Sequence, residues 1–133
     1  MANNFASLLP IPNDSERKKF NPEYAMHELI QVIDSKYSSH ITGIIASTQI
    51  GAFADDPILE FTFYLVFSRR DNYSYPLFNA KCINNNGSYP LDISSHYGPP
   101  ISHGVANDYS SFIQKMEEIL AEEKTRNVIL SMY

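Results

Sequence analysis

The four histidines are the residues of this chain best suited to acid–base or metal chemistry, and two of them share one segment. His96 and His103 both lie within residues 94–106. A metal site would need Cys82 or Asp92 as a third ligand, and the spacing fits none of the usual zinc signatures. The sequence also contains neither a Cys-x-x-Cys nor a His-Glu-x-x-His motif. We therefore expect no metal site and no cofactor.

A third histidine, His40, offers an enzymatic alternative. Residues His40-Ile41-Thr42 match the His-x-Thr element of two-histidine phosphodiesterases, which carry a second such element on a paired strand. Neither His96 nor His103 is followed two residues later by a hydroxyl side chain. A small hydrolase or phosphodiesterase that uses His40 with His96 or His103 remains the alternative, and it requires these side chains to converge in one cleft.

The sequence offers no signature of nucleophilic catalysis. It contains no Gly-x-Ser-x-Gly elbow, and the adjacent Ser102 and His103 do not orient a base toward a hydroxyl. The single cysteine, Cys82, shares one strand face with Phe78 and Ala80, so we expect a buried structural thiol. These features predict a protein that is not an enzyme.

Two amphipathic helices are the clearest elements that could position these residues. Asn21-Pro22-Glu23 predicts a helix start, because Asn is a favoured N-cap, Pro suits the first helical position and Glu the positive end of the dipole. Asn107 or Asp108 is expected to cap a second helix. The apolar stripes are Met26, Leu29, Ile30, Ile33 and Tyr37 in the first helix and Tyr109, Phe112, Ile113, Met116, Ile119 and Leu120 in the second.

Strand-like runs lie between the helices, at residues 42–50, 59–68, 77–83 and 88–93. The clearest alternation is in the second run, with one face formed by Leu59, Phe61, Phe63, Leu65 and Phe67. Asn86-Gly87 predicts a hairpin between the third and fourth runs, and Pro90 predicts that the fourth run lies at a sheet edge. Residues 94–106 are expected to form a long irregular loop.

These elements predict an α+β fold. A meander of four antiparallel strands is flanked by an N-terminal and a C-terminal amphipathic helix, and the apolar tail at residues 128–133 is either helical or a fifth strand. We expect residues 1–20, which include Pro10 and Pro12, to form an extended arm, and residues 21–133 to form the single domain.

Composition narrows the classes of function. The 133 residues include 10 Lys and Arg against 15 Asp and Glu, for a net charge of −5, and this balance argues against binding to a nucleic-acid backbone. No apolar run approaches the roughly 20 residues of a membrane helix. One cysteine excludes an intramolecular disulfide framework, and no secretory signal is visible. We therefore expect a cytoplasmic protein that binds neither nucleic acid nor membrane.

Tyrosines and glutamates supply a signal for an interaction surface. Tyrosine gives a large contact area at low entropic cost, and an acidic flank speeds encounter with a basic protein. Both residue types concentrate in the second half of the chain, the glutamates on the expected outer face of the second helix. The predicted partner-binding residues are Tyr73, Tyr75, Tyr89, Tyr97, His96, His103, Glu117, Glu118 and Glu122.

The layout resembles some immunity proteins of bacterial contact-dependent growth inhibition systems. The resemblance rests on the aromatic run 61–67, the charged turn after it, the strand 75–83, and Ile101-Ser102 leading into a helix at 108–112. It implies a non-enzymatic, acidic, cytoplasmic protein that blocks one cognate toxin domain, frequently a basic nuclease. A secretion chaperone and a phage-encoded inhibitor are the other candidates in the binding class.

Overall fold

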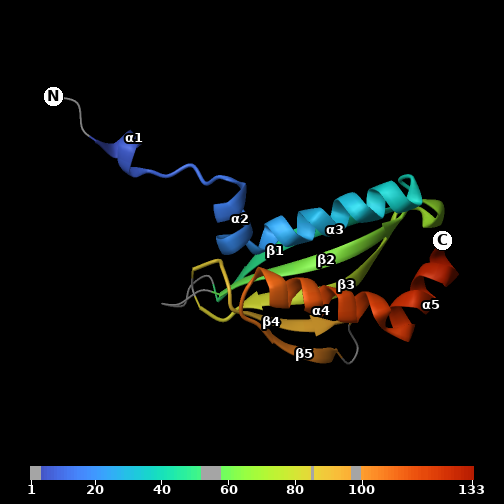
Figure 1. Ribbon diagram of the computed structural model, residues 1–133. Helices are drawn as coiled ribbons and strands as arrows, with labels where there is room; N and C mark the ends of the chain where they lie inside the picture. The colour runs from blue at the N-terminus through green and yellow to red at the C-terminus, as the bar shows by residue number, and fades with distance from the viewer. Residues whose placement is uncertain (1–3, 52–57, 85, 97–99) are drawn as a thin grey trace.

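A five-stranded antiparallel sheet with helices against it forms the body of the protein (Figure 1). The computed structural model describes residues 4–51, 58–84, 86–96 and 100–133. The strands lie in chain order and are β1 Ile41–Ile50, β2 Ile58–Phe67, β3 Tyr73–Cys82, β4 Leu91–Ser95 and β5 Ile101–Ala106. The helices are α1 Phe5–Leu8, α2 Asp14–Phe20, α3 Pro22–Tyr37, α4 Tyr109–Ala121 and α5 Glu123–Met132, with a short 3-10 turn, η1, at Ser68–Arg70. The predicted α+β fold is confirmed, with five strands.

The side chains of β2 alternate strictly and supply the centre of the hydrophobic core. Phe61, Phe63, Leu65 and Phe67 are buried beneath the helices, whereas the residues between them are half-buried on the other face. Fully burying one such side chain contributes about 1.5–3 kcal/mol. The buried thiol of Cys82 belongs to the same core, as the sequence predicted.

Gly43 on β1 allows α3 to approach the sheet closely. A Cβ at this position would lie 2.7 Å from Cζ of Phe63 and 2.9 Å from Cγ1 of Ile30. Both distances are far shorter than the 3.5–4.0 Å at which carbon atoms pack. The absence of a side chain at Gly43 therefore sets the distance between helix and sheet.

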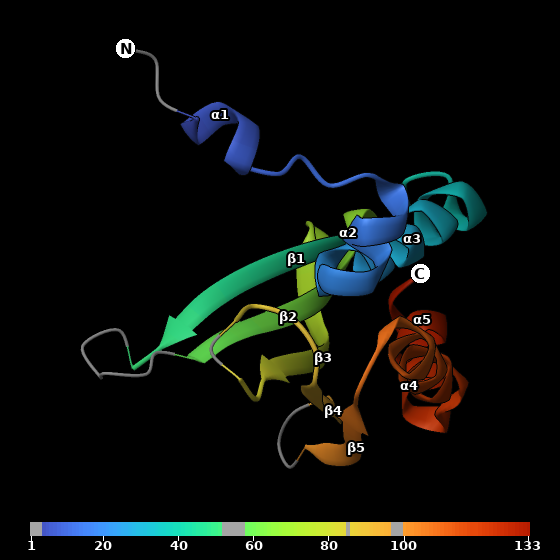
Figure 2. The ribbon, with the colours of Figure 1, turned by 60° about the vertical axis from the view of Figure 1, so that its left-hand side comes forward.

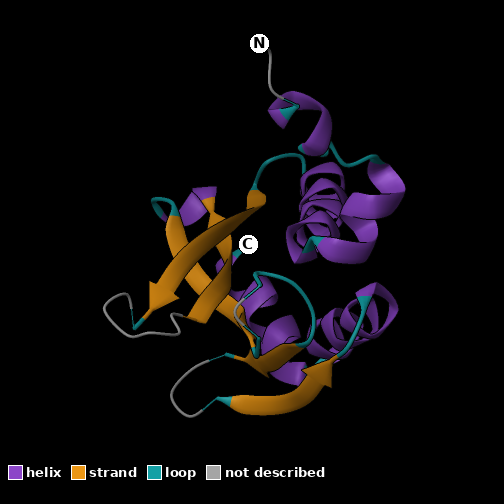
Figure 3. Cartoon of the chain, turned by 90° about the vertical axis from the view of Figure 1, so that its left-hand side faces the viewer, coloured by secondary structure: helices purple, strands orange, loops and turns teal. Residues whose placement is uncertain are grey.

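The helices α3 and α4 cover the buried face of the sheet (Figure 3). Asn21 caps α3, because its side chain accepts a hydrogen bond from the backbone N–H of Glu23 at 3.0 Å, and Pro22 is the first helical residue. Asp108 caps α4 in a reciprocal capping box with Ser111. Both helix starts were predicted from the sequence.

The arm expected at residues 1–20 contains two helices. In α2, a capping box joins the side chains of Asn13 and Glu16 to each other's backbone N–H groups. The Lys18 ammonium lies 4.4 Å from the centre of the Tyr109 ring, which ties α2 to the domain. The described segment before α2, residues 4–13 with α1, projects from the body (Figures 1 and 2).

The segment expected as an irregular loop at residues 94–106 contains a strand. β5 pairs with β4, so β4 is an interior strand rather than the predicted edge. Pro90 precedes β4, where its missing N–H removes no bond from the ladder. The connection at residues 83–90 is also longer than the two-residue turn that Asn86-Gly87 predicts.

The C-terminal tail is helical, which decides between the two conformations that the sequence left open. The ring of Tyr133 packs against Tyr37 and His40, with centroid distances of 5.8 and 5.9 Å. The Arg69 guanidinium lies 4.9 Å from the centre of the same ring. These contacts hold the end of α5 against η1 and the segment that joins α3 to β1.

Candidate partner-binding site

The junction between α4 and α5 turns Glu122 toward the sheet. Glu122 has extended backbone angles (φ −64°, ψ 140°), so the helix is interrupted at this residue. In a continuous helix, Glu122 would share the outer face with Glu118 four residues earlier. Instead its side chain is only 17% exposed and contacts residues of β4 and β5. The expectation that Glu122 lies on the outer face is therefore wrong.

The Glu122 carboxylate joins Ser95 and both histidines of the predicted site. Its Oε1 accepts a hydrogen bond from Ser95 Oγ at 2.8 Å and lies 2.5 Å from Nε2 of His103. Ser95 Oγ is also 2.9 Å from that His103 nitrogen. The second oxygen, Oε2, lies 3.0 Å from Nε2 of His96 but has no aligned hydrogen-bond donor. One carboxylate thus joins β4, β5 and His96, the residue that directly follows β4.

His96 is held from its other side by β3 and α5. Its Nδ1 lies 2.5 Å from the hydroxyl of Tyr75, and its Nε2 lies 3.2 Å from Oγ1 of Thr125. Thr125 donates its own proton to the carbonyl of Ile119, so the threonine oxygen can only accept from His96. This pattern assigns the proton of a neutral His96 to Nε2 and makes Tyr75 the donor to Nδ1. Burial lowers the pKa of His96 and therefore favours the same neutral form. The attraction of Glu122 acts in the opposite direction but is the smaller effect.

Tyr75 connects this buried network to a surface groove. The groove lies between β3 and α5 and has a volume of about 580 Å³. Its polar residues are exposed and its aliphatic residues are half-buried, so it combines an apolar interior with a hydrated margin. It is lined by Tyr73, Tyr75, Glu123, Lys124, Asn127, Val128, Ser131 and Met132.

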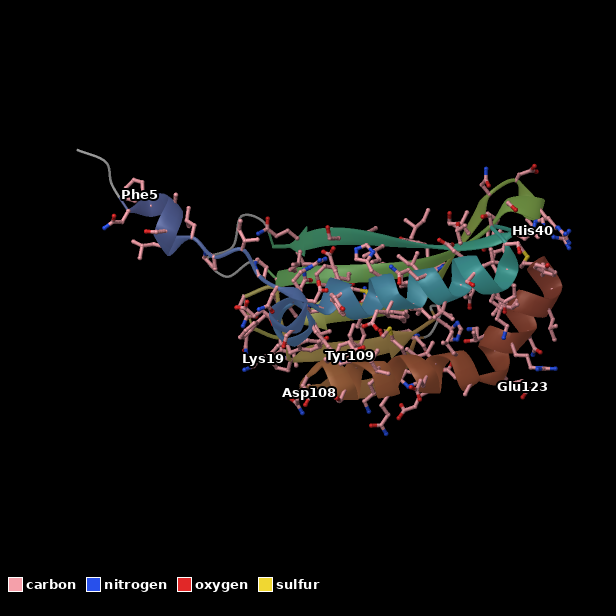
Figure 4. All side chains as sticks on the ribbon, turned by 45° about the horizontal axis from the view of Figure 1, so that its top comes forward. Phe5, Lys19, His40, Asp108, Tyr109 and Glu123 are labelled. Carbon is pink, nitrogen blue, oxygen red and sulfur yellow. The ribbon has the colours of Figure 1, made fainter. Side chains whose placement is uncertain are left out.

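Acidic side chains adjoin the groove and the network. Glu123 lines the groove and follows the turn between α4 and α5, where Figure 4 labels it. Glu118 is exposed on α4, and its Oε2 lies 3.5 Å from Nδ1 of His103. The groove lining thus pairs one acid, Glu123, with one base, Lys124, and Glu118 adds negative charge on the adjoining helix.

Most of the predicted partner-binding residues come together here. Tyr73 and Tyr75 line the groove, and Glu118 lies on the adjoining helix. His96 is buried, and the side chain of His103 is only 10% exposed, so both support the surface from behind. The remaining members of the network are Ser95, Glu122 and Thr125.

Two predicted residues do not belong to this site, and a third cannot be assigned to it because it lies outside the described residues. Tyr89 is buried against Phe112, with a ring distance of 6.1 Å, and burial raises the pKa of its hydroxyl. Glu117 is exposed but lines a different groove, between α3 and α4. Tyr97 lies outside the described residues.

Sequence reasoning missed the residues that α5 contributes. Val128 and Met132 line the groove, and Thr125 lies behind it. The sequence leaves the apolar tail at residues 128–133 open between helix and strand, and the helical spacing of Val128 and Met132 is the signal that could assign them. Ser95 carried no such signal, because its role depends on the position of Glu122.

His40 makes contacts separate from those of the other two histidines. Its Nε2 lies 3.3 Å from the Arg69 guanidinium, and its ring packs on Tyr133. Figure 4 places it at the end of the molecule away from Asp108 and Tyr109. His96 and His103 meet at Glu122, whereas His40 contacts Arg69 and Tyr133.

The network contains the side chains of a serine–histidine–carboxylate relay, but its serine is buried. Ser95 is fully buried, and its hydroxyl donates to Glu122 rather than pointing to a substrate. Across the residues that the structure describes, no three His, Cys, Asp or Glu side chains are placed to hold a metal ion. The arrangement is suited to holding Tyr75, β4 and the α4–α5 junction in fixed positions.

No protein-family model, curated protein or solved structure matches this chain. None of the helices in the described ranges combines the length and apolar character that crossing a bilayer needs.

Proposed function

We propose that this protein is a non-catalytic, acidic binding module, a bacterial immunity protein that neutralises one cognate toxin domain by binding it directly. The observation that carries the proposal is the placement of Tyr75. Its ring lines the groove, and its hydroxyl is fixed to buried His96. A ring already held in one orientation loses little entropy when a partner covers it, so it can serve as an anchor.

The charge distribution supports a basic partner. The chain carries a net charge of −5, and Glu118 is exposed on the helix that adjoins the groove. The groove lining itself holds one acid and one base, Glu123 and Lys124. Opposite charge on the partner would raise the association rate and make that rate fall with added salt. In this proposal the protein acts in the bacterial cytoplasm and contacts neither nucleic acid nor membrane.

The first experiment identifies the partner. The full chain, tagged and expressed at its native level in its host, is purified with whatever it binds. The proposal expects one stoichiometric protein, encoded next to this gene, whose toxic activity is lost when the two are mixed in equal amounts. Recovery of no partner under these conditions, or of a partner whose activity is unaffected, contradicts the proposal.

The second experiment locates the interface with the purified partner. Tyr73→Ala should weaken binding at least tenfold, since truncating an aromatic hot-spot residue costs about 2 kcal/mol or more. Glu123→Lys should slow association and reduce its dependence on salt. Tyr64→Ala on the helix-free sheet face and Asp34→Lys on α3 are the matched controls and should leave the Kd unchanged. Loss of affinity in the controls but not at Tyr73 would place the interface elsewhere.

Other binding functions would use the same surface with a different partner. A secretion chaperone would bind an exported protein without inhibiting an enzymatic activity, and a phage-encoded inhibitor would bind a host protein. The identity of the captured partner separates these functions from immunity.

A hydrolase is the second candidate, and one observation favours it. Ser95 Oγ lies 2.9 Å from His103 Nε2, and His103 Nδ1 lies 3.5 Å from Glu118, which is the order of a catalytic relay. Purified protein incubated with nitrophenyl esters and nitrophenyl phosphodiesters tests it. Turnover that disappears in both Ser95→Ala and His103→Ala would favour the hydrolase; no turnover, or turnover that both variants retain, argues against it.

A further inference from the structure

The sheet has two edges, and β5 is the protected one. Edge strands present unpaired backbone N–H and C=O groups, which proteins usually shield by short strands, irregularities, charge or proline. β5 has only six residues, its register with β4 shifts between Ile93 and Ser94, and Gly104 has a positive φ of 79°. These irregularities interrupt the regular edge that another strand would need.

β1 has none of these protective features. It is ten residues long and pairs with β2 in unbroken register from Ile41 opposite Phe67 to Ile50 opposite Ile58. The strand contains neither a charged residue nor a proline. Among the strands of the described chain, β2 is its only neighbour, so its other side is the border of the sheet (Figure 2).

Exposed apolar side chains accompany this free edge. Ile44 and Ile50 are 49% and 40% exposed, and both lie on the sheet face that α3 and α4 do not cover. Ala46 and Thr48, between them on the same face, are also exposed. A strand added beside β1 would pair the free backbone groups and cover these side chains together.

We propose that β1 is a self-association edge, at which two copies of the chain pair their β1 strands antiparallel and join two sheets into one. The self-complementarity of the strand argues for a second copy as the occupant, because one antiparallel register places exposed Ile44 of each copy opposite exposed Ile50 of the other. Each chain carries a net charge of −5, yet two β1 strands would meet without any like-charged pair, because the strand is uncharged. A two-fold axis between them satisfies both edges at once and closes the assembly as a dimer.

The lack of charge on β1 also distinguishes this edge from the proposed toxin-binding groove. β1 offers no acidic side chain to a basic partner, whereas Glu123 lines the β3–α5 groove. The self-association edge therefore stands independently of the proposed function, and the two can be tested separately.

Side-chain alternation limits the register of the pair. Opposing residues must point to the same face, so the two-fold axis passes through a residue position. An axis at Ser47 places Ile44 of each copy opposite Ile50 of the other, which covers both exposed isoleucines. An axis at Ala46 would instead place Ile44 opposite Thr48. We assign the axis to Ser47, because cross-strand apolar pairs stabilise a sheet.

Sedimentation velocity and light scattering on the full chain, across the micromolar range, test the association. We expect a dimer that becomes monomeric in Ile44→Lys/Thr48→Lys, with an unchanged circular dichroism spectrum. Val105→Lys is the matched control, since Val105 is 43% exposed on the opposite edge strand, and it should remain dimeric. A wild-type protein that is monomeric throughout, or a dimer that survives the double substitution, overturns the proposal.

Cysteine cross-linking tests the register in the same dimer. Ser47→Cys should form an intermolecular disulfide on mild oxidation, while native Cys82 is buried and does not compete. Cross-linking of Ala46→Cys alone would overturn the assigned register, and a dimer that neither cysteine links would overturn pairing through β1. Protection of β1 amides from hydrogen exchange only in a complex with another protein would assign the edge to that partner instead.

Discussion

The hydroxyl of Tyr75 lies 2.5 Å from Nδ1 of His96, and this contact joins a surface groove to a buried polar network. The tyrosine lines the groove, while its hydroxyl satisfies a buried histidine that also contacts α5. The pair therefore links the stability of the fold to the shape of the candidate binding surface.

Tyr75→Phe should lower the free energy of unfolding by about 1–3 kcal/mol, because it leaves Nδ1 of buried His96 without its donor. The ring remains, so the groove keeps its shape. Urea denaturation measures the loss, and Tyr64→Phe, which removes the same atom from the helix-free face, should change the value by less than about 0.5 kcal/mol. Equal losses in the two variants would mean that the Tyr75 hydrogen bond contributes nothing.

His96 should make the protein less stable in mild acid. Burial lowers its pKa, so below the ordinary value of 6.5 the unfolded chain binds a proton that the folded chain does not. Its contribution to stability is complete above pH 6.5 and is lost as the pH falls toward the folded pKa. Glu122 opposes the downward shift, whereas Lys124 and His103 add to it.

Denaturant titrations at pH 8 and pH 5.5 measure this dependence. His96→Asn should reduce the difference in unfolding free energy between the two conditions, since asparagine tolerates the positive φ of 57° at this position. His27→Asn, on the exposed surface of α3, should leave the difference as it is in the wild type. An unchanged difference in His96→Asn would assign the acid sensitivity to other groups.

Gly43→Ala should destabilise the protein by about 1–3 kcal/mol, because the new methyl group would overlap Phe63 and Ile30. Thermal unfolding followed by circular dichroism shows the loss as a lower Tm. Ala46→Val adds carbon atoms to the exposed face of the same strand and should change stability by less than about 0.5 kcal/mol. A Gly43→Ala variant as stable as the wild type would show that α3 can move away from the sheet at little cost.

Asn21→Ala should cost about 1 kcal/mol, since it removes the side-chain acceptor for the first turn of α3. Asn21→Ser keeps an acceptor and should recover most of the loss. Urea unfolding of the two variants makes the comparison, and equal destabilisation would point to a role for Asn21 other than capping.

Strong local patterns allowed most of the fold to be predicted from the sequence. The strict alternation in β2 and the caps at Asn21 and Asp108 are determined by neighbouring residues. β5 was missed because residues 101–106 include Gly104 and have no clear alternation. That strand exists through its pairing with β4, a long-range interaction that a local pattern does not encode.

The candidate site was harder to predict because it depends on one backbone break. Periodicity placed Glu122 on the outer face of a helix, whereas its extended ψ of 140° turns the carboxylate toward Ser95 and His103. Tyr89 shows the opposite error: composition marked it as a surface tyrosine, and packing against Phe112 buries it. Residue types indicated the kind of chemistry in the site, whereas which residues lie in it depends on the tertiary structure.

Cys82 gives the wild-type chain an internal reporter of transient opening of the hydrophobic core. The thiol is fully buried among residues of the sheet, and burial raises its pKa, so the reactive thiolate is scarce in the folded state. A thiol-specific dye should therefore label the protein only as fast as the core opens. Because the described chain contains no other cysteine, the labelling rate reads the kinetics of one known position without any engineered substitution.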